Sequence, residues 1–228
     1  SNLSRVVTGV RTSAESVASA SAQIAWGSND LSATGNAQKN VITGNEGNNT
    51  LDGGGGIDTL IGGNGIDSAD YSLAASGATV NLTTGLATND GDGSNDVLTT
   101  IENLIGSGFG DSLTGSVGVN TISGGVGNDT LFGSGGGDTM DGGLDTDTVD
   151  YSTGGATSIV VTLNGGSNTT VVVGGGINDT IRNIENVSGT AGADTITGDS
   201  GVNVIRGADG DDTLAGGDGN DTLDGGIG

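Results

Sequence analysis

The sequence predicts an all-β fold, a parallel β-solenoid in which short strands and turns alternate along a coil. Two observations predict it: a nine-residue pattern recurs through most of the chain, and the large core residues of a globular domain are scarce. Of 228 residues, 49 are Gly and aromatic residues make up 2%; Pro, Cys and His are absent. Because glycine loses the most entropy on folding, only a strict pattern or a bound ion makes such a chain fold.

The nine-residue rows lie in three blocks, residues 44–70, 106–150 and 189–228, which hold three, five and four complete rows. A partial row, Gly225–Gly228, follows the last block. The sixth position is Asp or Asn in every row, and the eighth is apolar, so we expect the eighth residues to form a thin core. These eighth-position residues are Leu51, Leu60, Ala69, Leu113, Ile122, Leu131, Met140, Val149, Ile196, Ile205, Leu214 and Leu223.

Two longer segments, residues 71–105 and 151–188, separate the blocks and resemble each other. Both follow an Asp that opens the triplet Asp-Tyr-Ser, and both contain Ile-Glu-Asn near their end. Alternating stretches inside them, ATVNLTTG and TSIVVTLNGG, predict β-strands. We therefore predict one solenoid domain over residues 41–228, with two β-rich inserts.

Residues 1–40 have a different composition, rich in Ala and Ser. Their apolar residues recur every seven positions, which predicts a short N-terminal helix. The stretch Thr12–Ala33 resembles part of the cytoplasmic helix of bacterial chemoreceptors, but the long helical hairpin of those proteins is missing. The predicted role is packing on the solenoid end or on a neighbour, with Trp26 as the anchor. The heptad residues are Leu3, Val10, Val17, Ile24 and Leu31.

The charge pattern excludes several functions. The formal net charge is −23, and only five residues are basic, which argues against nucleic acid or an anionic membrane as a partner. No run of residues is apolar and long enough for membrane insertion. Without His and Cys, the Ser–His and Cys–His forms of nucleophilic catalysis have no base. We expect a protein that is not an enzyme.

The row pattern has a physical explanation. The last three residues of a row form a strand whose central residue points inward, and the first six form a turn that glycine makes possible. Two rows make one coil, and stacked coils pair as parallel strands about 4.8 Å apart. Stacking places the sixth-position Asp residues of successive coils over one another, where like charges repel. A divalent cation removes the repulsion, and Ca²⁺ suits an all-oxygen cage better than Mg²⁺.

These rows resemble the RTX (repeats-in-toxin) nonapeptide family. The resemblance implies a right-handed parallel β-roll with several Ca²⁺ ions between successive turns at each edge. It also implies export of the unfolded chain by a type I channel and folding in the calcium outside the cell. Carried over row by row, the implied calcium ligands are Asn49, Asp58, Asp67, Asp111, Asn120, Asp129, Asp138, Asp147, Asp194, Asn203, Asp212 and Asp221.

Several positions depart from the family pattern. Three of the implied ligands are Asn and bring no charge, so we expect weaker sites there. Phe109 and Asp145 replace the fourth-position Gly of their rows, so turns at the insert boundaries are expected to bind poorly or differently. The loop Asn89–Asp96 is either an extra Ca²⁺ site or a solvated turn. Tyr71 and Tyr151, at matching places in the inserts, are expected to pack.

Two functions fit these observations. In the first, the protein is an extracellular or cell-surface structural protein whose coils stack end to end into calcium-dependent fibres or a matrix. In the second, it is the calcium-folded export and stabilising module of a larger toxin, hydrolase or adhesin. The chain starts at Ser1 and stops inside a row, so we expect a processed product or a fragment. The first function is favoured because the repeats have no catalytic or recognition domain beside them.

Overall fold

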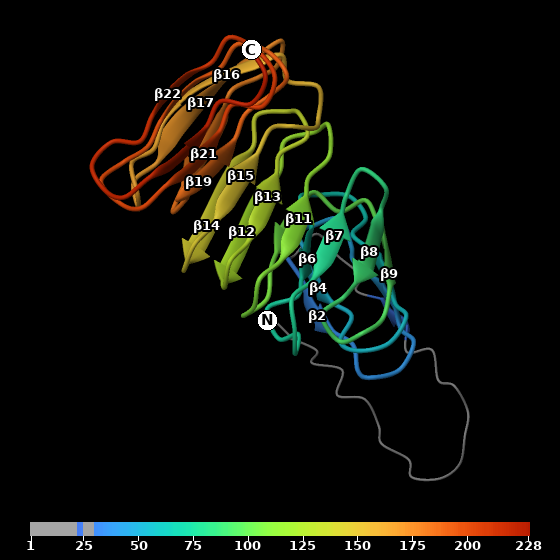
Figure 1. The fold of residues 1–228 in the computed structure, drawn as a ribbon. Coiled ribbons are helices and arrows are strands. Elements are labelled where there is room, and N and C mark those ends of the chain that lie inside the picture. Colours follow the sequence, from blue (N-terminus) through green and yellow to red (C-terminus); the bar gives the residue numbers. More distant parts are fainter. Residues whose placement is uncertain (1–21, 25–29) are drawn as a thin grey trace.

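The computed structural model describes residues 22–24 and 30–228. Its strands form two sheets that share one core and stack along a single axis, from blue to red in Figure 1. In order across the first sheet, the strands are β1 (Ala22–Ile24), β3 (Val41–Thr43), β5 (Thr59–Ile61), β9 (Asp96–Thr99), β8 (Leu86–Asn89), β7 (Thr79–Asn81), β11 (Ser112–Thr114), β13 (Thr130–Phe132), β15 (Thr148–Asp150), β19 (Asn186–Ser188), β21 (Val204–Arg206) and β23 (Thr222–Asp224). The second sheet contains β2 (Ser32–Thr34), β4 (Thr50–Asp52), β6 (Ser68–Asp70), β10 (Asn103–Ile105), β12 (Thr121–Val126), β14 (Thr139–Leu144), β18 (Asp179–Arg182), β17 (Thr169–Gly174), β16 (Ser158–Thr162), β20 (Thr195–Thr197) and β22 (Thr213–Ala215).

Each nonapeptide row supplies one short strand whose central residue is the eighth of the row. Successive rows alternate between the sheets, so a strand pairs in parallel with the strand two rows later, as Leu113 does with Leu131. The eighth residues are fully buried from Leu51 to Ile205. Leu214 is only partly buried and Leu223, in the last row, is 47% exposed. The predicted aliphatic core therefore runs along the solenoid and opens at its last coil.

Each insert folds into a three-stranded antiparallel meander that belongs to one sheet. In the first insert, β7, β8 and β9 fill the first sheet between β5 and β11. In the second, β16, β17 and β18 fill the second sheet between β14 and β20. The outer strands of each meander pair in parallel with the rows beside them. The strands of both inserts are thus part of the two sheets of the solenoid.

The N-terminal segment differs from its prediction. The described part of residues 1–40 contains no helix and instead supplies β1 and β2, which pair with β3 and β4. Ile24 and Leu31, two residues of the predicted heptad, lie in or beside these strands. Leu31 is partly buried against the core, and the row from Gly35 continues the frame. Trp26 lies outside the described residues.

No helix in the described residues is long and apolar enough to cross a membrane.

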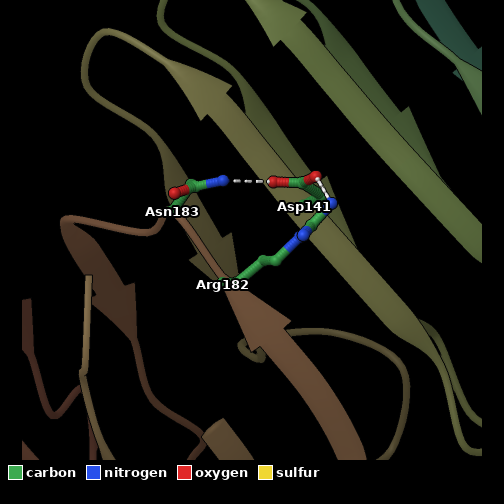
Figure 2. A network of polar contacts seen from close by, with 3 residues as sticks. All are labelled: Asp141, Arg182 and Asn183. Carbon is green, nitrogen blue, oxygen red and sulfur yellow. Dashed lines mark hydrogen bonds and ion pairs between the residues drawn. The ribbon is translucent and has the colours of Figure 1, made fainter. Parts of the chain in front are cut away.

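A polar network ties the second insert to the row before it. Arg182 of β18 forms an ion pair with Asp141 of β14, and the Asn183 amide donates to the other carboxylate oxygen at 2.7 Å (Figure 2). Within the described residues this is the one ion pair of the acidic chain. Because Arg182 is about half exposed, the pair adds little stability, of the order of 0–1 kcal/mol.

Candidate functional site

The turn edges of the solenoid carry a ladder of carboxylates. In each coil, one oxygen of the sixth-position side chain accepts the backbone N–H of the sixth residue one coil earlier. The Asp111 N–H donates to Asp129 at 2.8 Å, and the Asp129 N–H donates to Asp147 at 2.9 Å. The structure brings together in this way the pairs Asn49–Asp67, Asp111–Asp129, Asn120–Asp138, Asp129–Asp147, Asp194–Asp212 and Asn203–Asp221.

The inserts continue the ladder with residues that the sequence reasoning missed. Asp96 and Asp179 accept the N–H groups of Asp58 and Asp138, at 2.9 and 2.8 Å. Two glutamates, Glu102 and Glu185, likewise accept N–H groups at 2.8 Å, from Asp67 and Asp147. The sequence did contain a signal for the two aspartates. The motifs NDVLT and NDTIR, which contain Asp96 and Asp179, repeat the Asn-Asp-Thr-Leu of complete rows without the glycines before it. An earlier row from Gly35, which ends its turn at Asn40, was missed too.

The turns are of two kinds, and the first kind opens every block. In these closed turns, the second residue donates its N–H to the sixth-position side chain, as Ser107 does to Asp111 at 2.6 Å. The side chain of the second residue accepts the N–H of the fourth, as Ser107 does from Phe109 at 3.1 Å. Asn, Ser, Thr and Asp suit this position because their short polar side chains cap nearby backbone groups. The second residues of the closed turns are Asn36, Asn45, Ser107, Ser116, Thr190 and Asp199.

The second kind, the open turns, complete every block. Their second residue has a positive φ, as Gly125 does at 110°, so its N–H does not reach the sixth-position side chain. Their fourth residue has a positive φ as well, as in Gly127 at 117°. The second Oδ of the sixth-position Asp is then buried without a hydrogen-bond partner. In the described residues this holds for Asp58, Asp67, Asp129, Asp138, Asp147 and Asp212.

Glycine at the first position has a different role in both kinds of turn. Its φ is not positive, but a Cβ there would collide with the ladder. On Gly53, a Cβ would stand 2.5 Å from Oδ2 of Asp58, and on Gly124 it would stand 2.6 Å from the carbonyl oxygen of Gly142. The first glycine therefore provides the space that the carboxylate and the neighbouring coil's carbonyl occupy.

Burial without a partner changes the acidity of the open-turn carboxyls. Burial raises the pKa of Asp129 and of Asp138 to about 7, and the charges of neighbouring acids add to the rise. Burial likewise raises the pKa of Asp58 and of Asp147 to about 6. Such carboxyls ionise at neutral pH only at a cost, unless a cation compensates for the lost water.

A hard cation fits the donors that the open turns present. Carbonyl oxygens of the coil before approach each open turn: on Gly63 a Cβ would stand 2.6 Å from the oxygen of Asn45, and on Gly65 2.5 Å from that of Gly47. These carbonyls and the unpartnered carboxylate oxygen are the ligands that Ca²⁺ prefers. No three acidic side chains converge in the described residues, so a cation here would be held by carboxylate pairs and main-chain oxygens.

Most closed turns satisfy their sixth-position side chains within the protein; among the described residues Asn40 is the exception, since its Nδ2 is buried without a hydrogen-bond partner. The amides of Asn120 and Asn203 donate to the carbonyl oxygens of Glu102 and Glu185, at 2.6 and 2.8 Å. Asn at these positions supplies a donor where the preceding strand belongs to an insert and no complete turn lies upstream. These two Asn residues lack the charge of the Asp in other rows, but each donates a hydrogen bond that an Asp could not donate. The sequence alone did not indicate this role.

The two replacements of the fourth-position glycine have opposite explanations. Phe109 stands in a closed turn, where φ is not positive, so a side chain is tolerated. Asp145 stands in an open turn and adopts a φ of 82°, which is unfavourable for a residue with a Cβ. The first replacement leaves the backbone unstrained, and the second introduces strain.

The two insert tyrosines are buried, as predicted, and also join the ladder. The Tyr151 hydroxyl donates to Oδ2 of Asp179 at 2.9 Å, and the Tyr71 hydroxyl lies 3.5 Å from Oδ2 of Asp96. Each tyrosine thus gives the first ladder acid of its insert the partner that the open-turn acids lack.

The comparisons with known proteins agree with this geometry. A family model described as the RTX calcium-binding nonapeptide repeat matches residues 34–69, 114–149, 183–214 and 197–228, slightly more than half of the chain. No curated protein matches the chain. Nothing in these comparisons supports the likeness of the N-terminal stretch to chemoreceptor helices. The chain belongs to the family of RTX calcium-binding nonapeptide repeats.

Proposed function

We propose that this protein is a secreted, non-catalytic structural protein that folds when calcium binds between the coils of its solenoid. The observation that carries the proposal is the row of buried, unpartnered Oδ2 atoms in the open turns. Calcium would bind the carboxylate oxygens that have no hydrogen-bond donor in the protein, and its binding free energy would contribute to folding.

The proposed ligands follow from the two kinds of turn. The open-turn acids Asp58, Asp67, Asp129, Asp138, Asp147, Asp212 and Asp221 are the principal ligands. The closed-turn residues Asn49, Asp111, Asn120, Asp194 and Asn203 lie one coil earlier and complete the sites from the other side, with turn carbonyls beside them. Among these, the Asn residues contribute least, since two of them already use their amide on an insert carbonyl.

Secretion follows from the calcium concentration at which such sites work. Extracellular calcium modules bind at about 10⁻⁴–10⁻³ M, far above the level of a bacterial cytosol. The chain would therefore stay unfolded inside the cell and fold outside it. The net charge of −23 supports an expanded metal-free state, because self-repulsion opposes compaction.

A calcium titration followed by circular dichroism tests this function. We expect little β-structure in EDTA, a cooperative gain at millimolar Ca²⁺, and a weaker response to Mg²⁺. Full β-structure in EDTA that does not change when calcium is restored would overturn the proposal.

For the 228-residue chain we further infer end-to-end self-association. Strands β22 and β23 end their sheets with one edge unpaired, and Leu223 beside that edge is 47% exposed. Unpaired strand edges on a solenoid are templates for a further strand. A second copy could extend both sheets, and head-to-tail contacts of this kind give open filaments.

Sedimentation in millimolar Ca²⁺ and then in chelator tests the association. Large assemblies that dissolve on chelation support it. A monomer in calcium favours the alternative, in which these edges continue into the repeats of a larger secreted toxin, hydrolase or adhesin.

A further inference from the structure

The first insert forms a cleft against the solenoid that the repeats alone do not make. Its volume is about 170 Å³, and it lies where β4, β6 and β8 end. Its walls include the acids Asp52, Asp90 and Asp92 and the side chain of Tyr71. No Lys or Arg is among the described residues that line it.

Asp90 is the unusual residue of this cleft. Its side chain is 1% exposed, and Oδ1 accepts the N–H groups of Asp92 and Ser94 at 2.8 and 2.9 Å. That oxygen caps the loop. The other oxygen, Oδ2, is buried and has no hydrogen-bond partner in the described residues. A turn that needed only a cap would be served by Asn, which carries no charge that must be desolvated.

The surroundings of Asp90 add negative charge. Burial raises the pKa of Asp52, and the charges of Asp70 and Asp92 raise it further. Burial raises the pKa of Asp96 to about 7, and Asp58 and Asp90 contribute through their charges. A bound cation is stabilised most where several carboxylates lie together and no Lys or Arg side chain neutralises them.

The second insert provides a natural comparison. Its equivalent cleft, of about 300 Å³, is lined by Tyr151 and by the acids Asp150 and Asp179. The loop that corresponds to Asn89–Asp96 contributes Gly175, Gly176 and Ile177, so Asp90 and Asp92 have no counterpart there. These two loop acids are thus particular to the first insert and are not needed to close an insert loop over a turn.

We propose that the first insert carries a calcium site of its own, apart from the repeat ladder, with Oδ2 of Asp90 as its central ligand and Asp52 and Asp92 on either side. Calcium takes six to eight oxygen ligands and accepts waters among them. Because the three carboxylates do not converge on one point, Asp52 and Asp92 must close on the ion. Both have room to do so, since Asp92 is exposed and Asp52 only partly buried.

Calorimetric counting of calcium ions on the full chain tests this site. The variant Asp90→Asn keeps Oδ1 as the loop cap and replaces only the unpartnered oxygen. We expect it to bind one calcium ion fewer than the wild-type chain. The matched control Asp211→Asn removes the same charge from an exposed fifth position of a row and should leave the number unchanged.

The outcomes separate this site from the repeat sites. An Asp90→Asn variant that binds as many ions as the wild-type chain overturns the proposal and leaves the repeat sites intact. A wild-type chain that binds no calcium overturns both. If Asp90→Asn does not fold, Asp92→Asn, at the exposed rim, replaces it: weaker binding of a single ion supports the site, and unchanged binding of all ions rejects it.

Discussion

Closed and open turns are built on the same nine-residue frame and differ in the backbone at the second and fourth residues. In a closed turn, the second-position N–H reaches the sixth side chain, as Thr190 reaches Asp194 at 2.6 Å. In an open turn, a positive φ at the second position removes that donor, as at Gly125 with φ 110°. The carboxylate that loses it stays buried. An Asp at the sixth position is therefore a hydrogen-bonded structural residue in a closed turn and a proposed cation ligand in an open turn.

The order of the two kinds along the chain follows from what lies upstream. The closed turns of the second and third blocks stand after an insert, where β7, β10, β16 and β19 precede them in the sheets. The inserts offer no complete nonapeptide turn whose carbonyls could share an ion. A row that follows an insert therefore needs hydrogen bonds within the protein for its sixth-position side chain. Only later rows have the open turns in which we propose that calcium binds.

The largest expected effect is that of pH on the metal-free chain. The open-turn acids Asp129 and Asp138 have a pKa of about 7 in the fold, and Asp has about 3.9 when unfolded. The fold thus binds more protons than the unfolded chain between about pH 4 and pH 7, and its stability falls as the pH rises through that window. We expect circular dichroism in EDTA to show more β-structure at pH 5 than at pH 8. More β-structure at pH 8 than at pH 5 would contradict this expectation.

The substitution Asp138→Asn should follow in size. It removes the unpartnered charge of an open turn, so we expect a loss of about 2 kcal/mol in calcium, as for contacts with a charged group. The melting temperature should also rise less steeply with calcium concentration, because fewer ions are taken up on folding. Thermal unfolding at several calcium concentrations measures both.

Asp194→Asn is the closed-turn partner of that experiment. Asp194 accepts three protein donors, from the N–H and hydroxyl of Thr190 and the N–H of Ile159. Its replacement should lower the melting temperature and change the calcium dependence much less than Asp138→Asn does. If the two variants change the calcium dependence equally, the distinction between the turns is wrong.

Two glycines at the same fourth position test the backbone difference. Gly127, in an open turn, has a φ of 117°, and a Cβ there would also meet the backbone of the coil before. Gly118, in a closed turn, has an ordinary φ, and the nearest atom to a Cβ would be the Ser116 hydroxyl at 3.5 Å. We expect Gly127→Ala to cost about 1–2 kcal/mol and Gly118→Ala almost nothing, by urea unfolding in calcium. Similar costs would contradict the comparison.

The smallest effect concerns two serines at the second position. Ser134 has a φ of 73° in an open turn, so Ser134→Gly should stabilise the fold by about 0.5 kcal/mol. Ser116 caps the Gly118 N–H in a closed turn, so Ser116→Gly should destabilise it by a similar amount. Opposite signs in the same unfolding measurement are the result that the comparison requires.

The sequence predicted most of the fold because the frame repeats. A single apolar residue per row, such as Leu131 or Ile196, fixed the strand, its inward face and the register, and the structure agrees at each. The twin segments with Tyr71 and Tyr151 were recognised as inserts for the same reason, since each could be compared with the other.

The rest depended on contacts that no single row contains. The residue at the second position does not decide the kind of turn, since Ser116 stands in a closed turn and Ser134 in an open one, so the difference appears only when the hydrogen bonds to the sixth residue are seen. Glu102 takes an Asp position of the ladder because the insert brings it there, and its own row has no glycines to announce it. The predicted N-terminal helix is not shown: the described part of that segment forms the short strands β1 and β2, and a spacing of seven does not distinguish a helix from such strands.

The two meanders also determine the course of the whole rod. Opposite the first, β10 alone faces three strands, so one side of the molecule is longer by two strand spacings, about 10 Å. Opposite the second, β19 alone faces three strands, and there the longer side is the other one. Each insertion acts as a wedge, and the wedges enter from opposite flanks, so the second turns the axis back against the first. With one insert alone, we expect the solenoid axis to bend in one direction. With both, we expect the second bend to oppose the first.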